Sequence, residues 1–289
     1  MVHVLTRPQL EQVSSALGTE MAASPTSSVT RPEMYHIMRH SLEGKLDVRY
    51  MFAVDKWPDY TAILGQPNED TPGRKSVLNF HWNEEEGLRT LLNDGRLIDW
   101  AKPFIIKGIP VGGIPIFQKA FEDRGVVAEM GKTYMPFYLH KTVPDIKSVA
   151  MDDVTVGPMS PEHCQLIQQT WDYSDMVGEP DAVRNSIRHQ LTTFLSSCVT
   201  DKQGNPLSWV ITDEFGESQF GFTLPEHRRK GYYTLAKRFL IQRCLEEGHF
   251  IFAHVVEGNE ASLNAHKKLG YVFEETPNCA FFFVTMKEG

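Results

Sequence analysis

Residues 223–234 read Thr-Leu-Pro-Glu-His-Arg-Arg-Lys-Gly-Tyr-Tyr-Thr and carry the strongest structural signal in the chain. They place the end of a strand, a basic loop and the beginning of a helix in succession. The first N–H groups of a helix lack partners within it, and the helix dipole adds partial positive charge there. Gly231 lets the backbone approach a ligand closely, and Arg228, Arg229 and Lys230 attract an anion. The pattern indicates a diphosphate site. A solvated basic helix start explains this stretch about equally well when it is considered alone.

Two familiar phosphate motifs are absent from the sequence. The loop contains neither G-x-x-x-x-G-K-[ST] nor G-x-G-x-x-G, which excludes a P-loop and the dinucleotide-binding fingerprint. Any diphosphate site must therefore be of another kind.

Composition bounds the remaining possibilities. The chain has 289 residues, 41% of them apolar and 23% charged, as in an ordinary globular protein of about two domains. Its net charge of -8 argues against a dedicated nucleic-acid binder, and no apolar stretch is long enough to span a membrane. The cysteines are scattered, without a zinc pattern, and indicate a reducing compartment; they are Cys164, Cys198, Cys244 and Cys279. We expect no metal.

Hydrophobic spacing and turn residues predict alternating helices and strands in the first half. Helices are expected at residues 8–20, 84–93 and 116–124, and strands at residues 34–38, 48–54, 60–64, 104–107 and 133–140. The polar stretch 141–153 marks the expected boundary between a domain at 1–150 and a domain at 151–289.

The second half contains the longer and clearer series of elements. Strands are expected at residues 154–156, 198–200, 207–213, 218–224, 250–255 and 279–286, and helices at 161–171, 181–195, 231–247 and 259–269. The order is strand, helix, helix, three strands, helix, strand, helix, strand. We therefore predict the α/β class, as an α+β mixed sheet.

The basic loop resembles a known coenzyme-binding loop. Arg228-x-x-Gly231-x-Tyr233 is similar to the coenzyme A pyrophosphate loop of the GCN5-related N-acyltransferase superfamily, Gln/Arg-x-x-Gly-x-Gly/Ala. Tyr233 departs from that pattern; its amide can still donate, but its ring must point elsewhere. The segment from Asn259 to Tyr271 resembles the superfamily's closing segment, which flanks the pantetheine arm. The element order also matches this superfamily.

Three further segments narrow the resemblance to the glycine N-acyltransferase family. They are Ala-Val-Asp-Lys-Trp-Pro-Asp-Tyr at 53–60, Gly-Asn-Pro-Leu-Ser-Trp at 204–209 and Thr-Leu-Pro-Glu-His-Arg at 223–228. The resemblance implies a catalytic domain at 151–289 and a degenerate, related domain at 1–150 that lacks its own coenzyme loop. It also implies acyl-CoA as co-substrate, glycine or a similar amino acid as acceptor, and a mitochondrial location. The alternatives are another acceptor, such as glutamine or a protein amine, and a coenzyme-binding or interaction protein without catalysis.

Two residues are candidates for catalysis. Transfer to an amine needs a base, because an amino acid's amine is mostly protonated near neutral pH. Glu217 begins the strand that leads to the loop, where the resemblance also places the family's proposed base. The alternatives are an exposed turn carboxylate and the rival Glu226. His266 stands where the superfamily often has Tyr and could donate a proton to the thiolate, contact the coenzyme or lie on the surface.

The remaining candidates bind the coenzyme, and most come from the loop and its flanks. Asn259 could bond the pantetheine arm or cap a helix, and a backbone N–H where residues 218–224 part from 250–255 would stabilise the oxyanion. The candidate coenzyme-binding residues are Phe222, Thr223, Leu224, Arg228, Arg229, Lys230, Gly231, Tyr233, Thr234, Asn259 and Ser262.

Overall fold

The chain folds into two compact units. The structure, a computed structural model, describes residues 1–24, 28, 30–139, 151–172, 174–272 and 278–285. Unit 1 comprises Met1–Pro136 and Glu274–Gly289, and unit 2 comprises Phe137–Phe273. The expected boundary near residue 150 borders residues 140–150, which lie outside the described residues. The units differ from two consecutive halves because the last strand of the chain joins the sheet of unit 1.

Unit 1 is built on a mixed sheet. Its strands follow the order β1, β2, β3, β4, β5, β12, β6 across the sheet, with β4 and β5 parallel and the other pairs antiparallel. The strands are β1 (His3–Val4), β2 (Tyr50–Val54), β3 (Ala62–Pro67), β4 (Ser76–Trp82), β5 (Phe104–Pro110), β6 (Val127–Tyr138) and β12 (Cys279–Thr285). Its helices are α1 (Arg7–Ala23), α2 (Arg31–Leu42), α3 (Glu85–Asn93) and α4 (Ile114–Arg124).

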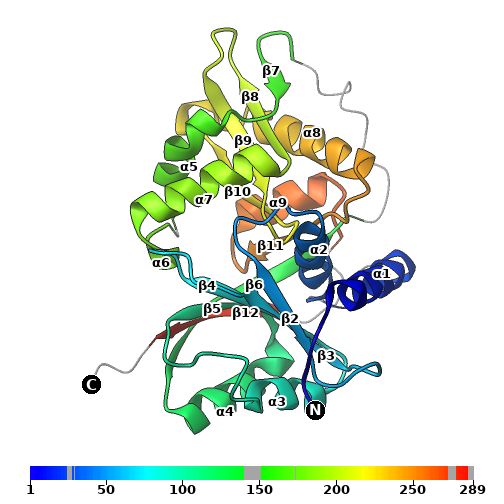
Figure 1. The fold of residues 1–289 in the computed structure, drawn as a ribbon. Coiled ribbons are helices and arrows are strands. Elements are labelled where there is room, and N and C mark those ends of the chain that lie inside the picture. The colour runs from blue at the N-terminus through cyan, green and yellow to red at the C-terminus, as the bar shows by residue number, and fades with distance from the viewer. Residues whose placement is uncertain (25–27, 29, 140–150, 173, 273–277, 286–289) are drawn as a thin grey trace. The chain divides into compact units, whose positions relative to one another are not determined.

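Helices cover both faces of this sheet. Figure 1 shows α3 and α4 on one face and α2 on the other. The core on the α3 and α4 side includes Phe80, Phe117 and Phe282, whose rings are nearly or fully buried. Phe282 comes from β12, so this core is completed by a strand that the chain supplies last. The predicted helices 84–93 and 116–124 are confirmed, and Gly125 ends α4 in the left-handed conformation with φ 62°.

The expected strand at residues 34–38 is wrong, because these residues lie inside α2. Met34, Ile37 and Met38 are buried and repeat at the spacing of one helix face, not at the alternating spacing of a strand. Pro32 near the helix N-terminus, where its missing N–H costs nothing, strengthens that choice.

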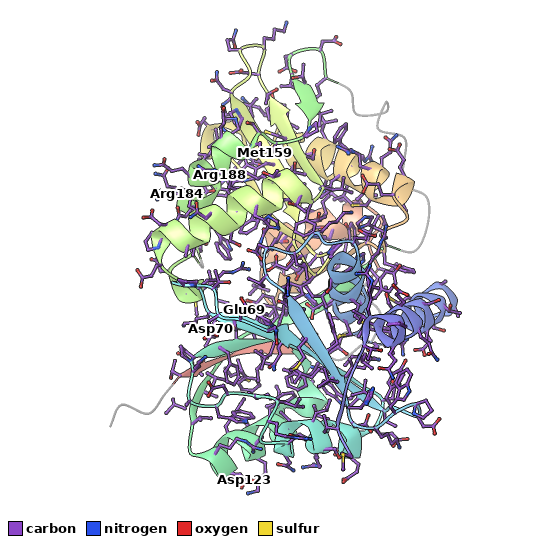
Figure 2. All side chains as sticks on the ribbon, in the orientation of Figure 1. Glu69, Asp70, Asp123, Met159, Arg184 and Arg188 are labelled. Carbon is purple, nitrogen blue, oxygen red and sulfur yellow. The ribbon has the colours of Figure 1, made fainter. Side chains whose placement is uncertain are left out.

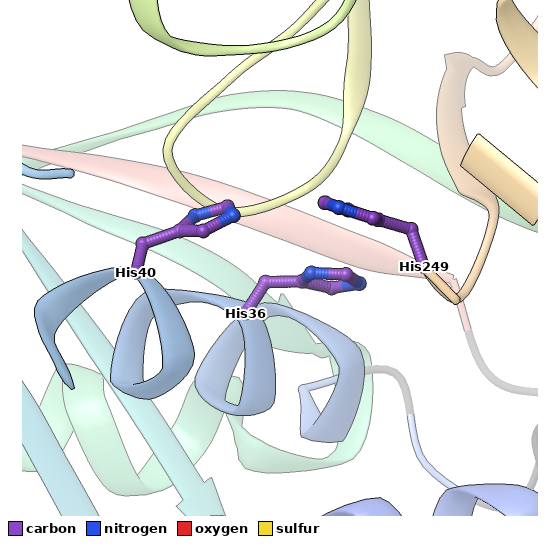
Figure 3. A group of neighbouring side chains, drawn as sticks. All are labelled: His36, His40 and His249. Atoms are coloured by element: carbon purple, nitrogen blue, oxygen red, sulfur yellow. The ribbon is translucent and has the colours of Figure 1, made fainter. Parts of the chain in front are cut away.

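The buried face of α2 also carries polar side chains. His36 and His40 lie one turn apart, 0% and 1% exposed, with ring centroids 5.8 Å apart (Figure 3). Glu33 on the same helix forms a buried ion pair with Lys107 of β5, at 3.5 Å, and accepts a hydrogen bond from Asn79 of β4. α2 is therefore held to the sheet by charge as well as by apolar packing.

Unit 2 contains a smaller antiparallel sheet in the order β10, β9, β8, β7. The strands of this sheet are β7 (Thr155–Gly157), β8 (Ser196–Thr200), β9 (Pro206–Thr212) and β10 (Ser218–Thr223). Unit 2 also contains β11 (Phe252–Val256), which forms a single parallel bridge with the residue before β10. Its helices are α5 (Cys164–Thr170), α6 (Ser174–Val177), α7 (Pro180–Thr193), α8 (Tyr232–Glu246) and α9 (Glu260–Lys268). All predicted helices of this half are confirmed, with ends shifted by a few residues.

Packing on the two faces of this sheet explains its strand sequences. Figure 1 shows α5 and α7 on one side of the sheet and α8 on the other. Trp209 of β9 is 0% exposed and lies in the core under α5 and α7 with Ile187 and Ile211. Both faces of β9 are covered, and its consecutive residues Trp209, Val210 and Ile211 are all buried.

The two units repeat one element order: strand, helices, three strands, helix, strand, helix. The predicted α/β class with mixed sheets is confirmed. In the part of the chain that the structure covers, none of the helices has the length and apolar character that crossing a lipid bilayer requires.

Figure 2 labels charged side chains on helices of both units, among them Asp123 and Arg184. Asp123 of α4 pairs with Lys119 one turn earlier, and Arg184 of α7 pairs with Asp181 at 3.1 Å. Exposed pairs of this kind contribute roughly 0–1 kcal/mol, so the buried cores carry the stability of each unit.

Candidate functional site

Strands β10 and β11 of unit 2 part immediately after they meet. Their pairing among the described residues is a single parallel bridge, between Glu217 just before β10 and Phe252. The Ser218 hydroxyl donates to the Phe252 carbonyl at 3.5 Å, and no pairing follows beyond it. The corresponding strands of unit 1, β4 and β5, are instead paired over four consecutive residues, from Ser76 to Asn79. The parting leaves backbone groups of β10 unpaired on the side toward β11.

β10 is irregular at the same place. A bulge separates Gln219 from Phe222 in the ladder with β9. Phe220 has a positive φ of 54°, a conformation rare for a bulky residue. Arg229, in the loop after β10, has φ 65°, and these two are the non-glycine residues with positive φ in the described chain. Backbone strain of this kind concentrates at functional sites.

The loop after β10 presents a series of free amides. A single 3₁₀ turn, Pro225–His227, leads through Arg229 to Gly231, which precedes α8 with φ 86°. Within the described residues, the N–H groups of residues 229–234 donate to no protein atom. These amides stand at the positive end of a helix of four turns. They are available to an anion, and Thr234 completes the series in the first turn of α8.

The basic side chains of this loop differ in placement. Arg228 folds back, donates from Nε to the Thr223 carbonyl at 3.2 Å and lies over the Phe222 ring at 5.6 Å. Arg229 and Lys230 are exposed, with Lys230 Nζ 3.4 Å from His227 Nδ1. Two cations of the loop are therefore free to move toward a ligand, whereas the third supports the end of β10.

The end of β10 is held by β9. The Ser208 hydroxyl contacts the Phe222 carbonyl at 2.9 Å and the Thr223 hydroxyl at 2.8 Å, and the Leu224 N–H donates to the Leu207 carbonyl. These bonds fix the point from which the loop departs.

The Tyr233 ring turns away from the loop and packs on Gly221 of the bulge. A Cβ at Gly221 would lie 2.8 Å from Tyr233 Cε2, so only glycine leaves room for the ring. Burial raises the pKa of Tyr233 above its usual range. The bulky side chain thus leaves its own amide accessible, as the sequence requires if this amide is to donate.

Glu217 is buried, at 7% exposure, and not an exposed turn carboxylate. Its Oε1 accepts the His254 backbone N–H at 3.0 Å and lies 3.2 Å from His254 Nδ1. The Glu217 N–H donates to Asp213 Oδ1 at 2.8 Å, which closes the turn before β10. The carboxylate is therefore fixed beside the point where β10 and β11 part. The rival Glu226 lies exposed on the 3₁₀ turn.

The closing segment forms α9. Asn259 caps it, with Oδ1 accepting the Ser262 N–H at 3.1 Å. His266 is 4% exposed, so it is not a surface histidine, and its Nδ1 lies 2.9 Å from the Ser262 carbonyl. Burial lowers the pKa of His266 to about 3, and the charge of Lys237 acts in the same direction. Because a carbonyl only accepts, Nδ1 carries the proton, and the neutral ring has no acidic proton at Nε2.

Lys237 on α8 is a further residue of this region, which was not predicted from the sequence. It is 0% exposed, and its Nζ has no hydrogen-bond partner among the described residues. Burial lowers the pKa of Lys237 to about 7, whereas interactions with Cys244 and Glu217 act in the opposite direction. Its spacing from Tyr233 and Ile241, which face inward on the same helix, was the available signal: a lysine in an apolar stripe.

Replacing Lys237 with methionine is expected to raise the free energy of unfolding by about 1–4 kcal/mol, because a buried charge without a partner disappears. The folded pKa lies below the ordinary 10.5 of the unfolded chain. The unfolded state therefore binds the proton more readily than the folded state. The destabilisation of the wild type by Lys237 is fully present below about pH 7 and decreases as pH rises toward 10.5.

Denaturant unfolding of the wild type and K237M at pH 6.5 and at pH 10 measures this difference. Arg243→Met is the matched control, because Arg243 forms an exposed pair with Glu247 on the same helix and should change stability by less than about 0.5 kcal/mol. Equal or lower stability of K237M at pH 6.5 contradicts the expectation.

Unit 1 lacks both features at the equivalent place. The helix after β4 is preceded by Glu84 and begins with Glu85 and Glu86, which oppose an anion there. Among the described residues, this acidic helix start and the continuous pairing of β4 and β5 distinguish unit 1 from the basic loop and the parted strands of unit 2.

Comparison with known proteins agrees with this arrangement. The FR47-like protein family model matches residues 198–279, which span β8 to the beginning of β12. Glycine N-acyltransferase of Pongo abelii is 23% identical over 249 residues, covering 78% of this chain and 80% of the relative. Human glycine N-acyltransferase-like protein 2 is 25% identical over 236 residues, covering 75% and 79%.

Solved structures share the fold. A Drosophila protein from a structural genomics programme superposes with a TM-score of 0.78 at 14% identity, covering 98% of both chains. A tandem GNAT protein from the clavulanic acid biosynthesis pathway superposes with a TM-score of 0.52 at 11% identity, covering 100% and 99%. The repeated element order agrees with a tandem arrangement. The chain thus resembles glycine N-acyltransferases over most of its length, and its fold is that of the GCN5-related N-acetyltransferases.

Proposed function

We propose that this protein transfers an acyl group from acyl-CoA to the amino group of glycine or a similar amino acid, producing an N-acylglycine and coenzyme A. The observation that carries the proposal is the series of free amides at residues 229–234, next to the parting of β10 and β11. The named relatives support acyl transfer to an amine.

The residues present fit coenzyme A. The amides after Gly231 would receive the diphosphate, and Arg229 and Lys230 would add charge to it. The unpaired edge of β10, from Phe222 to Leu224, would receive the amide groups of the pantetheine arm. Asn259 and Ser262 lie at the start of α9. Because Asn259 already caps that helix, it would support the arm through the position of α9.

Glu217 serves as the general base in this proposal. It lies at the start of β10, away from the diphosphate loop, so the thioester would lie near it. The amine nitrogen attacks the thioester carbon, and its proton passes to the Glu217 carboxylate. The His254 N–H bond holds the carboxylate oxygen in place during this step.

The tetrahedral oxyanion would be stabilised by backbone amides at the bulge, at residues 220 and 221. The bulge removes these two residues from the regular ladder with β9, whereas Phe222 pairs with Trp209. His266 contributes a neutral, well-fixed ring beside this region and no proton.

A matrix of acyl donors and amino acids tests the proposal. Free coenzyme A, detected with a thiol reagent, should appear with acyl-CoA plus glycine and not with either alone. Release with glutamine or a protein amine, and none with glycine, would move the assignment to another acceptor. Tight coenzyme A binding without release in any combination would favour a non-catalytic binding protein. The mitochondrial location implied by the resemblance remains part of the proposal, and localisation of the tagged full chain tests it.

A further inference from the structure

The buried amine of Lys237 lies among the residues proposed to act in transfer. Its Nζ lies 5.4 Å from the centroid of the Tyr271 ring, and no hydrogen bond of the described residues reaches it. An ammonium group in an apolar interior without a partner is destabilising. A buried ammonium group that costs stability and makes no hydrogen bond with the described residues indicates a role in function.

The titratable groups that face Lys237 come from four elements. Glu217 faces it from the start of β10, and the interaction between the two raises the pKa of Lys237 against the larger effect of burial. Its charge in turn helps to lower the pKa of His266. Among the described residues, the groups that interact with Lys237 are Glu217 before β10, Cys244 on α8, His266 on α9, and Tyr271 after α9.

Tyr271 connects this group to the parting of the strands. Its hydroxyl faces the Ser218 hydroxyl without a hydrogen bond of normal geometry. Ser218 follows Glu217 and contacts Phe252 at the last paired position of β10 and β11. His266 packs edge-on against the Tyr271 ring, with centroids 5.0 Å apart. Lys237 therefore lies behind the point where the strands separate.

We propose that Lys237 is a positioning residue whose ammonium charge stabilises the thiolate that forms when the acyl group leaves coenzyme A. The inference rests on the proposed function. During transfer the C–N bond forms, the C–S bond breaks and its electron pair remains on sulfur. Lys237 forms no bond to sulfur; it acts through its field, which water does not screen in this interior. The thiolate then takes the proton that Glu217 received from the amine, and the protein returns to its starting state.

This role predicts a pH dependence. Burial lowers the pKa of Lys237 to about 7, so the ammonium is lost as pH rises through that value. The wild type should therefore lose turnover on the alkaline side. That limb should be absent from Lys237→Met, which has no charge at any pH, and should move to higher pH in Lys237→Arg, whose charge persists.

The decisive measurement is the ionisation of the coenzyme A thiol bound to the protein, followed by thiolate absorbance. We expect K237M to reduce the thiolate fraction at pH 7 about tenfold, equivalent to about one unit of thiol pKa. Turnover should fall by a similar factor, with the KM for acyl-CoA within about twofold. K237R should recover part of both losses, and R243M, a control on the exposed side of α8, should match the wild type.

The outcomes separate this inference from the proposed function. An unchanged thiol ionisation in K237M overturns the inference even if the wild type transfers acyl groups. A turnover loss that is equal at every pH, and that K237R does not recover, also overturns it. If the wild type binds coenzyme A but transfers nothing, the proposed function fails, and the thiol titration still decides the role of Lys237. If coenzyme A does not bind, both are wrong.

Discussion

Glu217→Gln is expected to lower turnover about 10²–10⁴-fold, the usual contribution of a positioned general base. Glutamine keeps the size of the side chain. It also keeps an oxygen that can accept the hydrogen bond from the His254 N–H, which in the wild type is 3.0 Å long. It cannot accept the proton of the attacking amine. The fold should therefore be retained, and the acid limb of the pH–rate profile should shift because the group that must ionise is gone.

Steady-state kinetics from pH 5 to 9 and a thermal unfolding curve measure these two consequences. Glu226→Gln is the comparison, because Glu226 is an exposed carboxylate on the 3₁₀ turn after β10. We expect E226Q to keep the wild-type profile. An unchanged profile in E217Q, or a larger loss in E226Q, removes Glu217 from the role of base.

Gly231→Val is expected to weaken coenzyme A binding by about ten- to a hundredfold. Gly231 has φ 86°, which a β-branched residue adopts only at a cost of about 1–3 kcal/mol. A Cβ there would also approach the Met151 Cε at 3.1 Å. The loop would relax to another conformation, and the N–H groups of residues 229–234 would no longer point in one direction.

Calorimetric titration with coenzyme A measures the change. Gly204→Val is a matched control, since Gly204 has φ 87° in the turn between β8 and β9, with no atom within 4 Å of its Cβ position. The G204V variant should lose folding stability in the same way, while its affinity for coenzyme A stays at the wild-type value. Equal affinity of G231V and wild type would show that the coenzyme binds elsewhere.

Local sequence was sufficient for the part of the site that is contiguous in the chain. The stretch 223–234 contains its own turn, its charges and its helix start, so the free amides could be predicted from residue type alone. The cap at Asn259 was predictable for the same reason, and its side chain accepts the backbone N–H of Ser262. Glu217 could be named from its distance along one strand to the loop.

The helix at residues 34–38 has a local signal, namely Pro32 and the spacing of Met34, Ile37 and Met38, and its buried face packs on β3 and β4. The placement of the last strand depends instead on contacts between distant segments. β12 was expected at the end of the second half, yet it pairs with β5 and β6 of unit 1. The strand propensity of residues 279–285 is the same in either sheet. The strands that offer free edges therefore decide where β12 pairs.

Most of the helices and strands, and the basic loop that we propose binds a diphosphate, follow from the amino-acid sequence, because each depends on neighbours within one or two turns of chain. The parting of β10 and β11, the burial of Glu217 and the bare amine of Lys237 do not. They arise where β10, α8, α9 and Tyr271 meet. Their chemistry comes from exclusion of water, which is a property of packed elements and not of any residue in isolation.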